Sequence, residues 1–225
     1  RPSPIRAAAC GLALSLSACA APAVDWARSA ALEADRFAAA LFGEPGPETR
    51  PLAASPPPAA KPRRPLTTAV SARDPRTGAP LRLTPRALGG GAVEVRQSDG
   101  CVWRRDDWFA PSIWWRGCGD SATWRDGAAT VSGGAGLWPL RIGAEGRFRR
   151  RAIASTWRRY ERDTLCRVET AVEVLRPGRA LTPAFVVTCE DGKRVRTTWW
   201  SPEQGPIAFR KTHRDKGVEE VWVAE

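Results

Sequence analysis

The chain has 225 residues, with 35 Lys and Arg against 24 Asp and Glu, and a formal net charge of +11 at pH 7. The length fits one domain with additional segments, and the basic surface argues against cationic partners and predicts attraction to anions in general. The abundance of Ala, Arg, Pro and Gly is also typical of a GC-rich genome, so the charge alone does not define a binding site.

The first 18 residues predict a lipoprotein signal peptide. Arg1 and Arg6 precede an apolar run from Ala7 to Leu16, and the segment ends in Leu-Ser-Ala followed by Cys19. A basic start, a short apolar stretch and small residues before a cleavage site are typical of a secretory signal. The run is too short to span a bilayer, which takes ~20 residues. The ending resembles the bacterial lipobox, which implies that Cys19 is the lipidated first residue of the mature protein.

The same resemblance implies a location in the Gram-negative envelope. Asp after the lipidated Cys retains a lipoprotein in the inner membrane, and Ala20 stands there instead. The expected place is therefore the outer membrane, on its periplasmic face, with lipidated (palmitate-bearing) Cys19 as the membrane anchor. Export argues against nucleic acid as a partner and leaves lipopolysaccharide, anionic phospholipid and peptidoglycan carboxylates as the anions to bind.

Four further cysteines predict two disulfide bonds. An even number of cysteines in an exported domain favours disulfides, and no two of these cysteines form the closely spaced pair of a zinc site. Four cysteines allow three pairings. We favour Cys101–Cys118 with Cys166–Cys189, because the strands that carry the second pair are expected to be neighbours with both sulfurs on one face.

Two segments separate the signal from the main domain. Residues 19–43 combine the anchor with an Ala-rich helix over Val24–Phe42, for which Pro22 and Asp25 suit the start and Gly43 the end. Residues 44–66 are rich in Pro and Ala and have few large apolar groups, so they predict an extended tether. The basic end of this tether, at Lys61, Arg63 and Arg64, suits contact with anionic headgroups.

Residues 67–225 predict a disulfide-bonded β domain, mainly antiparallel, as a meander sheet that forms a partial barrel or a sandwich. The clearest strand is Thr164–Leu175, in which apolar and polar residues alternate. Further strands are expected in this order: Ala92–Arg96, Ala128–Ser132, Arg147–Trp157, Phe185–Cys189, Val195–Trp200, Pro206–Thr212 and Val218–Val223. Short turns separate the last strands, and no helices alternate with strands, so a parallel α/β sheet is excluded.

The main binding prediction rests on tryptophan beside arginine. The chain has 11 Trp and one Tyr, and in adjacent pairs such as Trp199-Trp200 strand geometry sends one ring to each face. Core filling is the usual role of Trp. The loop between Cys101 and Cys118 holds more aromatic rings than a sheet core needs. It predicts a ligand-binding surface formed by Trp108, Trp114, Trp115, Arg104, Arg105 and Arg116.

Three stretches resemble a family of uncharacterised exported lipoproteins of alphaproteobacteria. They are Cys101-Val102-Trp103 through Trp115-Arg116-Gly117-Cys118, the turn Leu137-Trp138-Pro139-Leu140-Arg141-Ile142-Gly143, and the hairpin Arg196-Thr197-Thr198-Trp199-Trp200-Ser201-Pro202-Glu203-Gln204-Gly205. The resemblance covers roughly residues 92–225. It implies a periplasmic β domain and carries no established activity.

No catalytic residue, metal site or cofactor is predicted. The only histidine, His213, lies in a basic stretch and is expected to be an exposed surface residue, and Gly89–Gly91 lacks the Lys-Ser/Thr of a phosphate loop. We therefore expect a non-enzymatic binding or scaffold module for anionic envelope components. Two alternatives stay open: a lipoprotein- or lipid-carrier-like half-barrel that holds an acyl chain, and an envelope glycan hydrolase using two of Asp106, Asp107, Asp120 and Glu203.

Overall fold

The computed structural model describes residues 46–62, 69–74, 78–88, 92–118 and 122–225. The expected signal peptide, Cys19 and the expected helix at Val24–Phe42 lie outside the described residues, as do Gly89–Gly91 and Asp120. The described part contains 13 strands and no helix. The prediction of a mainly β, antiparallel domain is confirmed.

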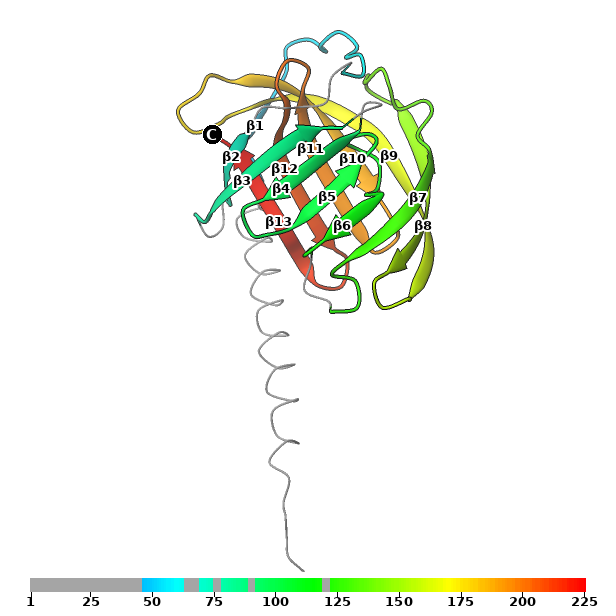
Figure 1. Cartoon of the computed structure of the whole chain (residues 1–225). Helices are drawn as coiled ribbons and strands as arrows, with labels where there is room; N and C mark the ends of the chain where they lie inside the picture. Colours follow the sequence, from blue (N-terminus) through cyan, green and yellow to red (C-terminus); the bar gives the residue numbers. More distant parts are fainter. Residues whose placement is uncertain (1–45, 63–68, 75–77, 89–91, 119–121) are drawn as a thin grey trace, which may run out of the picture.

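The strands follow one another along the chain as a meander (Figure 1). They are β1 (Thr49–Pro51), β2 (Val70–Arg73), β3 (Pro80–Ala87), β4 (Val93–Gln97), β5 (Val102–Arg105), β6 (Trp114–Arg116), β7 (Gly127–Gly133), β8 (Glu145–Ala154), β9 (Arg159–Val174), β10 (Thr182–Glu190), β11 (Arg194–Ser201), β12 (Gly205–His213) and β13 (Gly217–Ala224).

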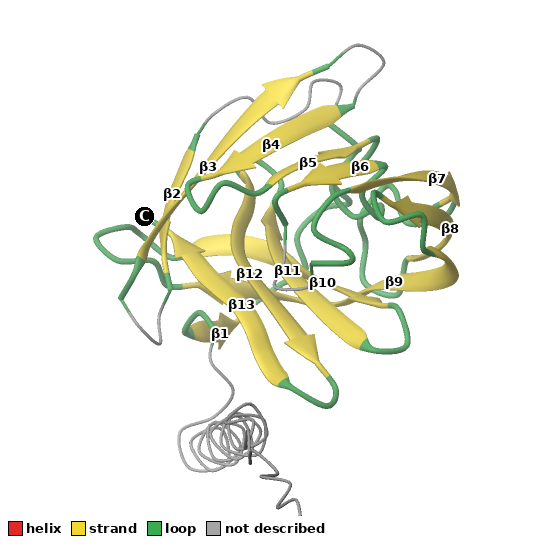
Figure 2. Ribbon diagram, turned by 60° about the horizontal axis from the view of Figure 1, so that its bottom comes forward, coloured by secondary structure: helices red, strands yellow, loops and turns green. Residues whose placement is uncertain are grey.

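Strands β2 to β13 close into an antiparallel barrel (Figure 2). Each pairs with the next along the chain, and β13 returns to pair with β2 through Ala224 and Ala72. The first strand, β1, stays outside this ring and pairs with the last three residues of β9. The closing contact is short, since only Val223 and Ala224 of β13 pair with β2. Closure reduces the exposed sheet edge, which is the usual liability of an open sheet.

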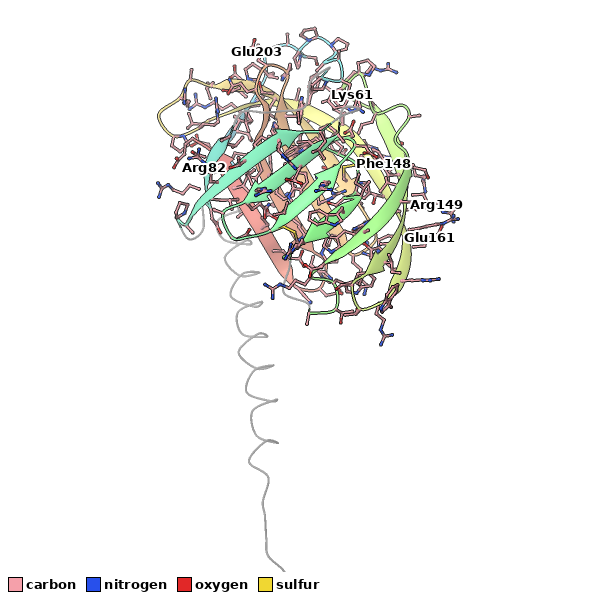
Figure 3. All side chains as sticks on the ribbon, viewed as in Figure 1. Lys61, Arg82, Phe148, Arg149, Glu161 and Glu203 are labelled. Atoms are coloured by element: carbon pink, nitrogen blue, oxygen red, sulfur yellow. A yellow bond between two sulfur atoms is a disulfide. The ribbon has the colours of Figure 1, made fainter. Side chains whose placement is uncertain are left out.

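Side chains alternate between the interior and the outer surface along each strand. On β8, Phe148 is buried inside, whereas its neighbour Arg149 points outward and binds Glu161 on β9 (Figure 3). On β11, Trp199 and Trp200 pack into two different apolar clusters. The expectation that this pair sends one ring to each face is confirmed.

Both predicted disulfide bonds are present. Cys101–Cys118 joins the turn before β5 to the end of β6, and Cys166–Cys189 joins β9 to β10. Cys166 and Cys189 stand directly opposite each other in the antiparallel pair, with their side chains on the interior face. The alternation read from the sequence therefore placed these two sulfurs correctly.

The loop between β5 and β6 fills one end of the barrel. Phe109 and Ala110 are buried in the largest interior cluster, together with Leu137 and Leu140 from the loop between β7 and β8. The carbonyl oxygen of Phe109 lies 3.7 Å from the Sγ atom of Cys166, so the loop reaches the interior disulfide. We call this closed end the Glu203 end, because the turn with Glu203 lies there (Figure 3).

The expected tether packs in part against the barrel. Residues 46–62 contain β1, and Ala59 is buried where its backbone pairs with Leu140. Lys61, expected to face lipid headgroups, forms an ion pair with Asp107 at 3.0 Å. A Pro-rich segment cannot form a core of its own, but its backbone groups and small side chains fit against the mouth of a barrel that already exists.

Two local predictions were wrong. The strand expected to reach Trp157 ends at Ala154, because the backbone turns there and Trp157 has a positive φ of 63°. His213, expected to be exposed, is buried at the end of β12, where its Nδ1 atom accepts a hydrogen bond from the backbone N–H of Asp215 at 3.1 Å. This contact inside the hairpin turn holds the ring against the barrel despite its basic neighbours.

Candidate functional site

Three arginines from widely spaced strands point into the barrel. Arg105 lies at the end of β5, Arg150 in the middle of β8 and Arg196 in β11. Their strand partners on the interior face include Val93, Val131 and Cys189. In the closed ring β5 and β11 are six strands apart and face each other, with β8 midway between them. We call these residues the interior arginine cluster.

The guanidinium groups of Arg105 and Arg150 are held by neutral groups. Arg105 donates hydrogen bonds to the carbonyl oxygen of Trp108 at 2.7 Å and to the hydroxyl of Ser112 at 3.3 Å. Its plane lies over the Trp103 ring, with 4.0 Å between the guanidinium carbon and the ring centroid. Arg150 lies over Trp115 in the same manner, at 4.4 Å. Such stacking orients a guanidinium without using its N–H donors.

No ion pair joins any of the three to a carboxylate of a described residue. The Nε atom of Arg150 is buried and has no hydrogen-bond partner, and the side chain of Arg196 makes no hydrogen bond to any described group. Burial lowers the pKa of Arg105 well below its usual value, and the nearby charges of Arg196 and Arg150 lower that pKa further. These are inward-facing cations that have no ion-pair partner among the described residues.

The cluster lies on the inward face of the barrel wall. Arg105, Arg150 and Arg196 are all half-buried. Each of them therefore keeps some accessible surface for contact with a small ligand.

The other interior basic residues, Arg162, Arg194 and Lys211, form ion pairs with carboxylates. Glu219 binds Arg194 at 2.8 Å and Lys211 at 3.0 Å, while Arg162 binds Asp191 at 3.4 Å. Burial raises the pKa of Glu219, but the hydrogen bonds and charges of Arg194 and Lys211 outweigh burial and hold the pKa at about 2. These partly exposed pairs form a rim at the end opposite Glu203, where the β10–β11 and β12–β13 turns lie (Figure 2).

Asp191, which is paired with Arg162, acts on Arg150 and Arg196 by charge alone, and Glu220 is the carboxyl group with the largest charge effect on Arg105. It is enclosed within the barrel, and burial raises its pKa, while the charges of Lys211 and Arg105 partly oppose that rise. Its carboxylate accepts hydrogen bonds from the Trp222 indole at 3.2 Å and from the Gln97 amide at 3.5 Å. Glu220 therefore offsets at most one of the three positive charges.

The Trp108 indole is a further unsatisfied donor beside the cluster. Its Nε1 atom is buried without a hydrogen-bond partner. The ring contacts Trp103 edge-on, with 5.5 Å between centroids, and lies 6.2 Å from Trp200. The unpartnered interior groups are thus all N–H donors, which is the pattern expected of a site that receives an acceptor-rich ligand.

The predicted surface of Trp and Arg is divided between the two faces of the barrel wall. Trp108, Trp115 and Arg105 lie inside, where Trp115 donates its indole N–H to the carbonyl oxygen of Trp124 at 2.8 Å. Trp114, Arg104 and Arg116 are on the outer face by strand alternation. The structure therefore brings three of the six predicted residues to the interior site.

On the outer face Arg104 is already engaged. It donates to the Glu94 carboxylate at 2.8 Å and lies over the Trp114 ring. Arg86 and Arg96 bind the same carboxylate. Burial raises the pKa of Glu94, but the combined arginines lower it below its usual value. This outer arrangement is a neutralised ion cluster, unlike the interior one.

The sequence prediction missed Arg150 and Arg196. Each carried a usable signal, since both alternate with residues of the interior face, Arg150 with Phe148 and Ala152, and Arg196 with Thr198 and Trp200. The abundance of arginine elsewhere in the chain hid this signal.

The carboxylates proposed for a hydrolase have structural roles or stand apart. Asp107 accepts the Phe109 backbone N–H at 2.9 Å and the Trp138 indole N–H at 2.7 Å, besides pairing with Lys61. Glu203 is exposed in the β11–β12 turn. In the described part of the chain no cluster of His, Cys, Asp and Glu has the arrangement of a metal site. These positions give the glycan hydrolase alternative no support.

Comparison with protein-family models, with curated proteins and with solved structures gave no match. Among the described residues, no helix has the length and apolar character needed to cross a bilayer. Fold and site together define a closed antiparallel barrel with a basic interior.

Proposed function

We propose that the protein is a binding protein that takes an anionic ligand into its barrel. The observation that carries this proposal is the interior arginine cluster, whose three cations form no ion pair with a carboxylate in the described part of the chain. An unpaired buried charge costs several kcal/mol. An anion that bridges the guanidinium groups offsets that cost, and it gains charge-assisted hydrogen bonds in a medium of low dielectric constant.

The envelope location predicted from the sequence is part of this proposal. Two disulfide bonds support an oxidising compartment, and the proposed lipid anchor at Cys19 would hold the barrel at the periplasmic face of the outer membrane. The anions available there include the phosphate groups of lipopolysaccharide and phospholipid and the carboxylates of peptidoglycan. The resemblance to exported lipoproteins is consistent with that place.

The carrier alternative has less support. The rings of Trp103, Trp200 and Trp222 are buried against other aromatic rings, and the β5–β6 loop fills the Glu203 end. A long acyl chain needs a continuous apolar lining, whereas the inward face of the barrel wall carries the three arginines of the cluster. We therefore favour a compact anion over an extended lipid chain.

Isothermal titration of the whole chain with inorganic phosphate at low ionic strength tests the proposal. We expect one site, weakened at least tenfold by Arg196→Met. The matched control is Arg149→Met, which removes an arginine of the outer face that is paired with Glu161, and it should change the affinity by less than twofold. If phosphate, sulfate and acetate all fail to bind, or if both variants weaken binding equally, the interior site is wrong.

A further inference from the structure

The interior arginine cluster has more positive charge than a singly charged ligand can neutralise. Three guanidinium groups stand against the single carboxyl of Glu220. Arg162 is paired with Asp191, and Arg194 and Lys211 share Glu219, so these two carboxylates have no charge left over for the cluster. With Glu220 ionised, a surplus of two positive charges remains. A carboxylate ligand would leave one of those charges buried and uncompensated.

The directions from which the arginines approach also favour a tetrahedral group. Arg105 and Arg196 come from opposite walls of the barrel and Arg150 from the wall between them. A planar carboxylate offers two oxygens in one plane, while the terminal oxygens of a phosphate monoester point in three directions. Arginines that come from three walls of the barrel match the second shape better.

The described protein groups supply no acceptor to two of the donors here. Arg150 Nε and Trp108 Nε1 are buried without acceptors, and Arg105 uses only part of its five N–H donors, on Trp108 and Ser112. The adjacent faces of Trp103, Trp115 and Tyr160 fix the planes of Arg105 and Arg150. The donors are therefore held in place before a ligand arrives, which lowers the entropic cost of binding.

From these observations we infer that the ligand bound at Arg105, Arg150 and Arg196 carries a phosphate monoester in its dianionic form. This inference rests on the proposed function and specifies the chemistry of the same site. The shared chemistry is the monoester group, which both a soluble phosphorylated metabolite and a lipid headgroup such as that of phosphatidic acid present.

Methyl phosphate and methyl sulfate form a matched pair of probes for this inference. They have nearly the same shape, but at pH 8 methyl phosphate carries two negative charges, since its second pKa is about 6, and methyl sulfate carries one. Titrated into the whole chain at pH 8, methyl phosphate should bind at least tenfold more tightly than methyl sulfate and acetate. Arg150→Met and Arg196→Met should each reduce that preference to less than threefold, with Arg149→Met unchanged.

The outcomes separate the two proposals. If methyl sulfate and acetate bind as tightly as methyl phosphate, and Arg196→Met weakens all three, the anion site stands and the monoester inference is overturned. If none of the three probes binds, the proposed function itself fails.

Where methyl phosphate binds as expected, co-sedimentation with phosphatidylcholine vesicles, with and without phosphatidic acid, distinguishes the two sources of the monoester. Binding that needs phosphatidic acid and is lost in Arg196→Met indicates a lipid headgroup, and methyl phosphate binding without vesicle binding indicates a soluble monoester.

Discussion

Trp157 is held in a backbone conformation that a large side chain rarely adopts. Among the described residues it alone, apart from glycines, has a positive φ, and it is 81% exposed in the β8–β9 turn. Left-handed backbone costs an L-residue about 1–2 kcal/mol, whereas glycine adopts it freely. We expect Trp157→Gly to raise the free energy of unfolding by about 0.5–1 kcal/mol in urea titrations. The comparison is Ile142→Gly, at a second exposed apolar residue. If Trp157→Gly lowers the free energy of unfolding as much as Ile142→Gly does, the turn geometry is contradicted.

Glu219 should make the free energy of unfolding depend on pH in the acidic range. Its pKa of about 2 lies below the ordinary 4.5 because Arg194 and Lys211 outweigh the effect of burial. A depressed pKa stabilises the fold above pH 4.5, and the stabilisation is lost as the pH falls from 4.5 through 2. Allowing for partial exposure, Glu219→Gln should lower the free energy of unfolding by about 2 kcal/mol at pH 7.

The difference between wild type and Glu219→Gln should shrink steadily as the pH is lowered below 4.5, as measured by urea unfolding at several pH values. Glu203→Gln, at an exposed turn carboxylate, serves as the control and should differ little from wild type at any pH. A constant deficit in Glu219→Gln at every pH would show that the side chain stabilises the rim by shape rather than by charge.

At the scale of single elements, the two disulfide bonds differ in access. Cys118 is partly exposed beside the β6–β7 turn, whereas Cys166 and Cys189 are buried in the interior cluster, with 0% and 3% of their surfaces exposed. Under native conditions a mild reductant should therefore open Cys101–Cys118 first. Alkylation followed by mass spectrometry shows which disulfide bond is reduced first. If Cys166 and Cys189 are alkylated before Cys101 and Cys118, that pair does not lie in the core.

Strands were predictable where alternation was regular and turns were marked. The meander from β9 to β13 has Arg176-Pro177-Gly178, Asp191-Gly192 and Lys216-Gly217 in its turns, and these elements were expected within a few residues of their observed bounds. β1, β2, β3, β5 and β6 were not expected. Four of them are four residues long or shorter and lie outside the clear pattern, and β3 contains Pro85, which normally argues against a strand interior.

At the scale of the whole molecule, closure of the barrel determines which residues form the candidate site. The sequence indicated Arg105 but placed it on an outer surface with Arg104 and Arg116, because local alternation does not reveal which face becomes the interior. Only the pairing of β8 with β9 and of β13 with β2 brings Arg105, Arg150 and Arg196 toward one another. These contacts join residues far apart in the chain, which no local pattern specifies.

The same closure predicts a conflict between stability and binding. Without ligand, Arg196 is an inward-facing cation with no ion-pair partner among the described residues, so Arg196→Met should raise the free energy of unfolding of the empty protein by about 1 kcal/mol while it weakens anion binding at least tenfold. Urea titrations with and without phosphate measure both effects. A variant that is less stable than wild type in the absence of phosphate would show that Arg196 serves the fold rather than a ligand.

The most direct test of the account is a crystal structure of the whole chain grown with methyl phosphate. We predict difference density for the phosphate inside the barrel, within hydrogen-bond distance of the guanidinium groups of Arg105, Arg150 and Arg196, and no such density in crystals of Arg196→Met. Density confined to outer arginines such as Arg149, with the interior filled by ordered water alone, would contradict the claim that the barrel interior is an anion-binding site.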